Sequence, residues 1–503
     1  MITPWRTCVL LATSVISLVL TAVVSVGVAA GATSTSPKVA VTCVGRTAVV
    51  DGPARVDRAL GIIQPQVPDD DVACGQGPSS MPVSAPLGAV GASTRYNGGA
   101  PPLLSHQGIT MGTASSPGAT TITPIFWTPL IKHAPLSYGF PSNYESSLDG
   151  LTADLASSSG KPSTVLGELT QYTNASGAHL SNQITAGSAL TSSAAPSTNV
   201  ARCTPDTGHI YNDQSGYVAC VTDAQIAAEG TAVVEAAQLP MDGSHLYAVF
   251  LPEGIEVCYG SANGTEGGTC TPNHGVTASG FCAYHADAAQ LVSGQISGQI
   301  SGLIYAAMPY SVWDSRTGLD CNGSDTFPQG DPPVDVIASS YVHEVAEAIT
   351  DPVGEGWIDR RGNEIGDLCA YTYGPTSSTS TGARYSQVLG GQDFEIQQLF
   401  SNASYAKNQA TGCQSSWSIP TVTLKSAGKA KVGVPTTFTA SVATPSGGVM
   451  ARSWEINGQV VGSGASLTYT FENAGTAQVT LTVTDTGTYQ ATSNIESVSV
   501  TKK

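Results

Sequence analysis

The segment from Val342 to Pro352 constrains the fold of this chain more than any other, because both its ends and its buried face can be inferred from the residues. Pro332 and Pro333 precede it and Pro352 ends it, since proline lacks a backbone donor and clashes with the preceding turn. Apolar residues recur at positions i, i+3, i+4 and i+7, namely Val342, Val345, Ala346 and Ile349. This spacing predicts an amphipathic helix with one buried stripe.

Polar side chains gather off that stripe. His343 and Glu347 are four residues apart, so an imidazole and a carboxylate would stand one above the other and could bind one metal ion. Glu344 stands where a His-Glu-x-x-His metallopeptidase helix keeps its general base. Here Glu347 replaces the second histidine of that motif. The segment therefore resembles a degenerate zincin helix, with His343 and Glu347 as metal ligands and Glu344 as the catalytic base.

Further acidic residues follow the helix. Asp351 continues the ridge of His343 and Glu347, and a glycine-rich loop leads to Glu364 and Asp367. We expect a further metal ligand among these three carboxylates. Zinc accepts both imidazole nitrogen and carboxylate oxygen, whereas calcium, the alternative, prefers oxygen alone. The non-functional alternative is a solvated helix face with a weak His–Glu pair.

A second short motif places Cys282 three residues before His285. Cysteine and histidine at this spacing occur in metal sites. A disulfide-bonded cysteine beside a packed histidine is the interpretation we favour. His285 is kept as a further candidate metal ligand.

The N-terminus predicts export. Arg6 is followed by an apolar run from Cys8 to about Val28 and then by small residues, which predicts a signal peptide at 1–32. An uncleaved membrane anchor is the alternative, because the run is long. Of the 11 cysteines all but Cys8 remain after cleavage, and an even number favours disulfides in a secreted protein. Cys203/Cys220 and Cys258/Cys270 are candidate local bridges and Cys43/Cys74 could staple the N-terminal segment, but the sequence alone does not fix the pairing.

The balance of charge excludes several classes of partner. Only 11% of the 503 residues are charged, and the formal net charge is −17. Nucleic-acid binding and docking to anionic lipid both need a basic surface, so neither is expected. After the leader, no stretch of the chain is long and apolar enough for an integral membrane domain.

Composition and periodicity divide the mature chain into three parts. Residues 33–102, rich in Gly, Pro, Ser and Asp, are predicted to be an irregular extension or a propeptide. Residues 103–417 are predicted to form an α+β main domain, for which a zincin-like arrangement is one option. Its clearest elements are strands at 121–127 and 245–251 and a helix at 224–237.

The tail, residues 418–503, is predicted to be an all-β, immunoglobulin-like sandwich. Strands are expected at 421–424, 436–442, 452–456, 466–471 and 478–483. Asn457-Gly458 indicates a type I′ hairpin turn, and Trp454 would fill the core between the sheets. The motifs at 454–458, 467–471, 474–476 and 479–485 closely resemble a PKD domain. The resemblance implies an accessory role, with contact to cell wall or polysaccharide, and no active residues.

Scattered motifs of the main domain resemble the phosphate-induced protein (Exordium-like) family and its bacterial relatives. They lie at 104–108, 125–127, 281–285, 306–310, 348–352, 356–357, 364–369 and 399–403. The plant members are extracellular and generally lack the pair at His343-Glu344. A metalloenzyme therefore cannot be inferred from them.

Two functions follow from these observations. The first is a secreted metal-dependent hydrolase, a zinc metallopeptidase that acts on extracellular protein or peptide. The alternative is a non-catalytic, Exordium-like extracellular or wall-associated protein with a structural metal site or none.

Overall fold

The computed structural model describes only the backbone for 38–43 and 46–51. It also describes residues 103–105, 109–112, 120–131, 138–196, 219–259, 269–271, 281–289, 300, 302–311, 321, 326–360, 362–407, 412–425 and 428–503. The predicted leader at 1–32 lies outside them, as do Cys74 and Cys203. The chain divides into two compact units, Met1–Ala54 and Arg55–Lys503.

The first unit contains a short antiparallel hairpin. Strand β1 (Lys38–Cys43) pairs with β2 (Arg46–Asp51) over their whole length. The hairpin falls within the stretch that composition predicted to be irregular. Each of its strands has only six residues, and they lie in a stretch rich in Gly, Pro, Ser and Asp, so the pattern did not stand out in the sequence.

A mostly parallel sheet organises the first part of the second unit. Its strands are β4 (Thr120–Trp127), β5 (Ile184–Ala186), β6 (Leu190–Ser192), β8 (His245–Phe250), β11 (Tyr284–Asp287) and β12 (Ile304–Met308). The order is β11-β12-β8-β4-β5, with β6 also paired to β4. Only β11 runs antiparallel to its neighbour, β12. The predicted strands at 121–127 and 245–251 are confirmed.

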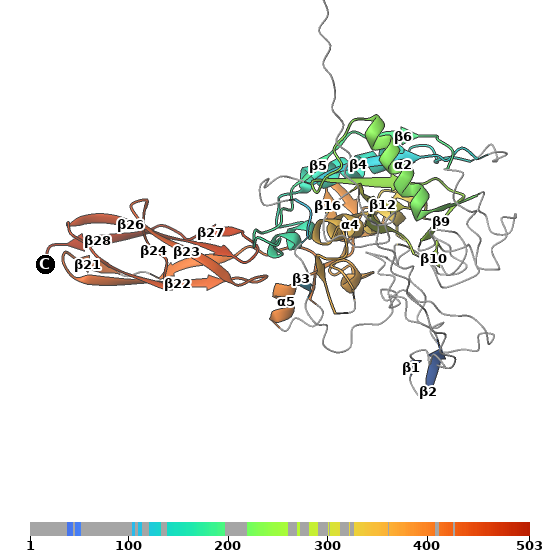
Figure 1. The fold of residues 1–503 in the computed structure, drawn as a ribbon. Helices are drawn as coiled ribbons and strands as arrows, with labels where there is room; N and C mark the ends of the chain where they lie inside the picture. The colour runs from blue at the N-terminus through green and yellow to red at the C-terminus, as the bar shows by residue number, and fades with distance from the viewer. Residues whose placement is uncertain are drawn as a thin grey trace, which may run out of the picture. The chain divides into compact units, whose positions relative to one another are not determined.

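Helices cover both faces of this sheet (Figure 1). Alternate residues of each strand point to opposite faces, so Phe126 and Phe250 pack with helix α1 (Tyr144–Ser158) and helix α4 (Pro332–Thr350). Ile125 and Val249 pack on the other side with helix α2 (Asp223–Ala236). A mixture of helices and strands was predicted and is confirmed. The parallel pairing was not, because the strands that form it are far apart in sequence.

Smaller elements surround this layer. A second sheet has the order β10 (Thr269–Cys270), β9 (Ile255–Tyr259), β7 (Ala219–Thr222). After α4 the chain forms short pairs: β13 (Trp357–Ile358) with β3 (Leu104–Ser105), β14 (Ser377–Ser378) with β15 (Arg384–Tyr385), β16 (Gln387–Leu389) with β17 (Gln392–Phe394), and β18 (Leu399–Phe400) with β19 (Cys413–Gln414). Short helices are η2 (Val165–Gln171), η3 (Asp367–Cys369) and α5 (Asn402–Ala406).

Helix α4 is the most deeply buried helix of the fold. Pro332 and Pro333 occupy its first turn and Pro352 follows its end, as the sequence predicts. Every residue from Val334 to Thr350 is buried. The apolar stripe therefore faces the core as expected, and the polar side is covered as well. The non-functional alternative, a solvated helix face, is wrong, because strand β11 and the loop after α4 pack over the polar side.

The tail is a two-sheet β-sandwich. One sheet has the order β20 (Thr421–Lys425), β22 (Pro435–Ala443), β25 (Ser466–Thr470). The other contains β21 (Lys429–Lys431), β28 (Glu496–Thr501), β26 (Gly475–Asp485), β23 (Val449–Ile456) and β24 (Gln459–Gly462), with β27 (Gln490–Thr492) paired to β26. Asn457 and Gly458 both have positive φ, and Trp454 is 0% exposed in the core. The predicted sandwich, its turn and its core tryptophan are confirmed.

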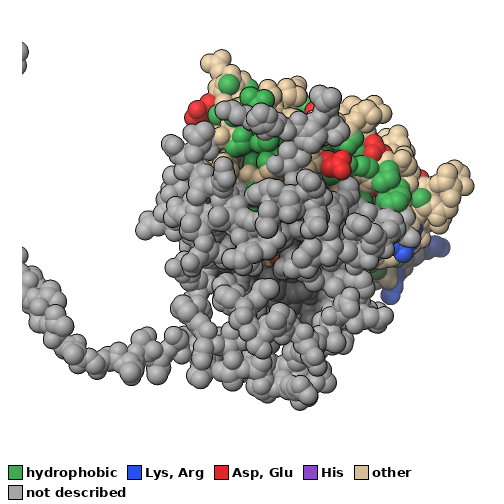
Figure 2. Space-filling model, turned by 90° about the vertical axis from the view of Figure 1, so that its right-hand side faces the viewer, with side chains coloured by type: hydrophobic (Ala, Val, Ile, Leu, Met, Phe, Trp, Pro, Cys, Tyr) green, Lys and Arg blue, Asp and Glu red, His purple; other side chains and the backbone are tan. Residues whose placement is uncertain are grey.

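The described surface carries little charge. Figure 2 shows acidic side chains scattered among apolar and uncharged polar ones on the described part of one face. This distribution agrees with the low charge and the acidic balance of the chain. Among the described residues, no helix has the length and apolarity needed to cross a membrane.

Glu168 in η2 is a buried carboxyl outside the polar side of α4. Its effect on the stability of the core can therefore be tested separately. Its side chain is 0% exposed, Oε2 accepts from Nε2 of Gln171 at 3.0 Å, and Oε1 has no hydrogen-bond partner. Burial raises the pKa of this carboxyl to about 8. The folded protein therefore keeps a proton that the unfolded chain releases at a lower pH, so ionisation destabilises the fold as pH rises towards 8.

We expect Glu168→Gln to be close to neutral at pH 5 and to stabilise the protein at pH 9, by a few kcal/mol at most. Urea unfolding at both pH values measures the difference. The control is Glu235→Gln on the exposed side of helix α2, which should change stability equally little at both values. An effect of Glu168→Gln that is the same at pH 5 and pH 9 would contradict the assignment.

Candidate metal centre

Helix α4 carries three of the predicted site residues into the protein interior. His343, Glu344 and Glu347 are each 0% exposed. Nε2 of His343 lies 3.0 Å from Oε1 of Glu347, as side chains one helical turn apart can. The sequence thus placed these side chains correctly relative to one another, and the fold buries them.

Strand β11 brings a second imidazole to the same place. Nε2 of His285 lies 2.8 Å from the backbone carbonyl oxygen of Asp351, at the end of α4. A carbonyl oxygen only accepts hydrogen bonds, so Nε2 carries the ring proton of neutral His285. Nδ1 therefore presents a lone pair on the other side of the ring.

That lone pair of His285 faces carboxylates. Nδ1 lies 3.1 Å from Oε2 of Glu344 and 3.9 Å from Oε2 of Glu347. Three acceptor atoms turned towards one another repel unless a proton or a cation lies among them. Metal-bound histidines commonly donate their other N–H to a backbone carbonyl or a carboxylate, and His285 has this arrangement. Its position therefore fits a metal ligand.

Backbone amides of the following loop fix one oxygen of Glu347. Oε1 accepts from the N–H groups of Gly366 and Asp367 at 3.1 and 3.0 Å. Nε2 of Gln397 donates to the carbonyl of Gly366 at 2.8 Å and holds the turn from its other side. Oε2 of Glu347 has no hydrogen-bond partner. Glu347 thus joins the loop to the helix through Oε1, which also lies against His343.

The loop delivers two more of the predicted ligands. Glu364 is 1% exposed, and neither of its carboxylate oxygens has a hydrogen-bond partner. Its Oε1 lies 3.7 Å from Nε2 of His285. Oδ1 of Asp367 lies 3.7 Å from Nε2 of His343, while Oδ2 accepts from the N–H of Glu364 at 3.1 Å. Both carboxylates thus lie against the imidazoles, as the sequence led us to expect.

Asp351 has different contacts. Its Oδ1 accepts from the N–H of Gly356 at 2.8 Å, and its carbonyl orients the ring of His285. These contacts fix the start of the loop and the position of a neighbouring imidazole. Its Oδ2 is buried without a hydrogen-bond partner, so a role of Asp351 as metal ligand stays a prediction beside its positioning role.

Burial opposes charge at five groups of this cluster. It raises the pKa of Glu344 and Glu364 well above the usual range, and neighbouring carboxylates add to the effect. It raises the pKa of Asp367 to about 8 and that of Asp351 to about 7, and it lowers the pKa of His285. Desolvation is the largest cause in each case. A bound cation would remove this penalty, because it favours ionised carboxylates and neutral imidazoles.

Two sets of three side chains could each hold a metal ion. One is His343, Glu344 and Glu347, and the other is His285, Glu347 and Glu364; within each set the ligand atoms lie within 4.8 Å of one another. Imidazole nitrogens together with carboxylate oxygens are donors that zinc accepts. The structure therefore brings His285, kept only as a further candidate in the sequence, to the centre of the site.

Two disulfides fix the segments that carry these residues. Cys282–Cys321 begins three residues before His285, and Cys369–Cys413 begins just after the acidic loop. The expectation that Cys282 is disulfide-bonded is confirmed. The histidine beside it is more than a packed side chain, because it faces the carboxylates of α4.

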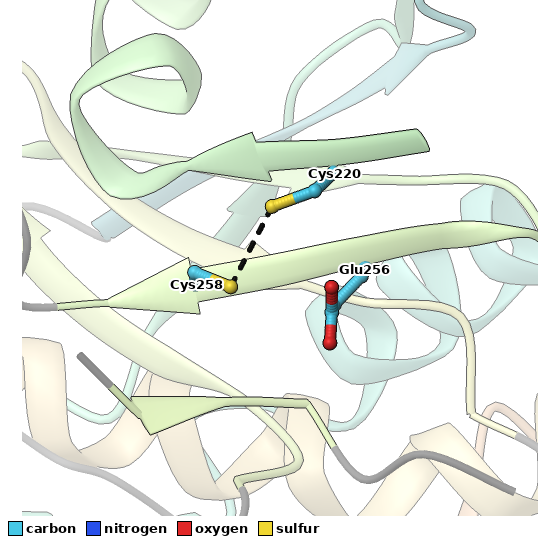
Figure 3. Close-up of side chains that lie close together, drawn as sticks. All are labelled: Cys220, Glu256 and Cys258. Atoms are coloured by element: carbon cyan, nitrogen blue, oxygen red, sulfur yellow. Dashed lines mark hydrogen bonds between the residues drawn. The ribbon is translucent and has the colours of Figure 1, made fainter. Parts of the chain in front are cut away.

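A separate cluster contains Cys220 of β7 and Glu256 and Cys258 of β9 (Figure 3). The two sulfur atoms are 3.5 Å apart. Each of the two cysteines is disulfide-bonded, so neither offers the thiolate that a metal needs. This cluster is therefore not a metal site. That both cysteines are in disulfides agrees with the sequence, while the side chains of their expected partners lie outside the described residues.

Comparisons with known proteins bear on the tail alone. No family model matches the chain, and no curated protein matches it. The PKD1 domain of Vibrio anguillarum Epp is 22% identical, with 17% of this chain and 99% of that chain covered and a TM-score of 0.15. The PKD1 domain of the Vibrio cholerae metalloprotease PrtV is 25% identical, with 16% and 94% covered and a TM-score of 0.14. An M14-like peptidase PKD domain from a Thermoplasmatales archaeon is 20% identical, with 17% and 92% covered and a TM-score of 0.12.

Gly366, which the sequence reasoning did not single out, gives a direct test of the geometry. Its backbone has φ −82°, which any residue adopts, but an added Cβ would lie 2.6 Å from Nδ1 of His343. We expect Gly366→Ala to displace this imidazole and to weaken zinc binding by about 10–100-fold, as other changes behind metal ligands do.

Competition with a chromophoric chelator measures that affinity. The matched control is Gly150→Ala on helix α1, where an added Cβ meets nothing within 4 Å. Its zinc affinity should equal that of the wild type. Unchanged affinity in Gly366→Ala would show that His343 does not bind the metal.

Proposed function

We propose that this protein is an exported metal-dependent hydrolase, a zinc metallopeptidase that acts on extracellular protein or peptide. The observation that carries the proposal is the position of Glu344. Its carboxylate lies on the same buried helix as His343 and Glu347 and 3.1 Å from the ring of His285. A proton acceptor beside a candidate metal centre is what metal-assisted hydrolysis requires.

The chemistry divides between the metal and the side chains. Zinc, when bound, supplies a Lewis acid and a water of lowered pKa. His343 and Glu347 hold the ion on α4. Glu344 accepts the proton of the attacking water and returns it to the leaving group, which is the function of the glutamate in a zincin helix. Helix α4 lies against a mostly parallel sheet with β11 at its edge, and this supports a zincin-like arrangement of the main region.

The donors support zinc over calcium. Calcium takes oxygen ligands almost exclusively, whereas His285 and His343 offer two nitrogens at the centre of the cluster. The number of carboxylates keeps calcium as the alternative. A carboxylate in place of the second histidine donates more charge to the metal, so we expect a less acidic bound water and an activity optimum shifted to higher pH.

The compartment and the partners belong to the same proposal. Two disulfides in the described part of the chain are typical of exported proteins. The β-sandwich tail, with its PKD-like motifs, would serve as an accessory module that contacts cell wall or polysaccharide. The main region would be related to the Exordium-like proteins, for which its scattered motifs are the support.

One observation favours a second candidate function. His285, His343, Glu344 and Glu347 are all 0% exposed, which suits a metal that holds the fold together. In that case the protein is a non-catalytic, Exordium-like extracellular protein. The two functions differ in what depends on Glu344: turnover in the first, and stability alone in the second.

The test is Glu344→Gln in the zinc-loaded mature protein. We expect hydrolysis of a fluorogenic protein substrate to fall by about 10²–10⁴-fold, the usual contribution of a general base. Zinc content and thermal stability should stay at the wild-type level, because the amide keeps the size of the side chain and removes only its basicity.

The control is Glu235→Gln on the exposed side of α2, which should retain full activity. Wild-type protein that binds zinc, gains stability from it and hydrolyses no substrate would reject the hydrolase and favour the structural role. Equal activity in Glu344→Gln and wild type would reject Glu344 as the base.

A further inference from the structure

We propose that the centre holds two divalent cations, with Glu347 as the ligand that bridges them. One ion would lie between His343 and Oε1 of Glu347, and the other among His285, Glu364 and Oε2 of Glu347. This inference rests on the metal centre of the proposed function but not on its catalysis.

The two oxygens of Glu347 face different imidazoles. Oε1 lies 3.0 Å from Nε2 of His343, and Oε2 lies 3.9 Å from Nδ1 of His285. Glu347 is also the residue that both candidate ligand sets share. A carboxylate between two metal ions presents one oxygen to each, and two-metal sites place their ions about 3.5–4 Å apart. The geometry of Glu347 therefore matches that of a bridging ligand.

The part of the cluster around His285 and Glu364 has the features of a separate cation-binding position. Nε2 of His285 is engaged with the carbonyl of Asp351, so the lone pair lies on Nδ1, which faces Oε2 of Glu344 at 3.1 Å. Glu364 is 1% exposed, and both of its oxygens lack a hydrogen-bond partner. A buried carboxylate without a partner is costly, and it comes from a different element than the ligands on α4. A cation here would satisfy Glu364 and the lone pair of His285 together.

The charge of the cluster also exceeds what one ion offsets. Five carboxyl groups lie at this end of α4: Glu344, Glu347, Asp351, Glu364 and Asp367. No lysine or arginine forms an ion pair with any of them in the described part of the chain. One divalent cation offsets two negative charges and a second offsets two more. Two ions thus bring a fully ionised cluster close to neutrality, which burial demands.

A single proton shared between His285 and Glu344 is the competing explanation. Their facing atoms are 3.1 Å apart, a hydrogen-bond distance. In that case His285 binds no metal, and the protein holds one ion on His343 and Glu347. The number of metal ions per chain separates the two explanations, and it needs no activity measurement.

The experiment counts zinc in the full-length mature protein. The protein is loaded with zinc, desalted and analysed by native mass spectrometry. We expect two zinc ions per chain in the wild type, about one in His285→Ala and about one in His343→Ala. His245→Ala is the matched control, because His245 on β8 bonds to Asp242 outside the cluster, and it should keep two.

Cobalt(II) gives a second readout that needs no variant. In the wild type, two cobalt ions bridged by a carboxylate couple magnetically, so the electron paramagnetic resonance signal per cobalt should fall as the second equivalent binds. One zinc per chain and a signal proportional to cobalt would overturn the two-ion inference and leave a single-metal hydrolase intact. No bound metal at all would overturn the inference and the proposed function together.

Discussion

The polar side of this protein's core is governed by several carboxyl groups that are buried away from solvent. Glu344, Glu347 and Glu364 lie within a few ångströms of two imidazoles, and all are buried. Desolvation and mutual repulsion both oppose their ionisation. Such an arrangement persists in a folded protein only if protons or cations compensate it. The mixed nitrogen and oxygen donors could hold a metal ion, which would supply that compensation.

The buried carboxyl groups and imidazoles come from a helix, a strand and a loop that further bonds hold in place. Helix α4 supplies candidate ligands at a fixed i,i+4 spacing, and antiparallel strand β11 places His285 opposite them. The amides of Gly366 and Asp367 hold one oxygen of Glu347, so the loop and the helix are joined through the site itself. Disulfides tie the segments before His285 and after the loop. Backbone groups thus hold His285 and one oxygen of Glu347, while neither carboxylate oxygen of Glu364 has a hydrogen-bond partner.

Local sequence patterns predicted the elements that depend only on residues close together in the chain. The prolines at both ends and the apolar spacing predicted α4. Alternation predicted the strands of the sandwich, and Asn457-Gly458 predicted its hairpin turn, because few residues tolerate positive φ. The parallel pairing of β4, β8 and β12 could not be predicted in this way. It joins strands separated by long stretches of chain, and no short-range pattern specifies which of them become neighbours.

The sequence by itself determined that His343, Glu344 and Glu347 stand on one helix, because helical spacing is a property of the backbone. It also determined that acidic residues follow close behind. Only the tertiary structure decided that this polar side is buried, since burial depends on what packs over it. It likewise decided that His285, 59 residues before Glu344, faces the same carboxylates, and that Asp351 orients this ring. Those decisions come from the pairing of β11 with β12 and from the path of the loop after α4, which are long-range contacts that no local pattern encodes.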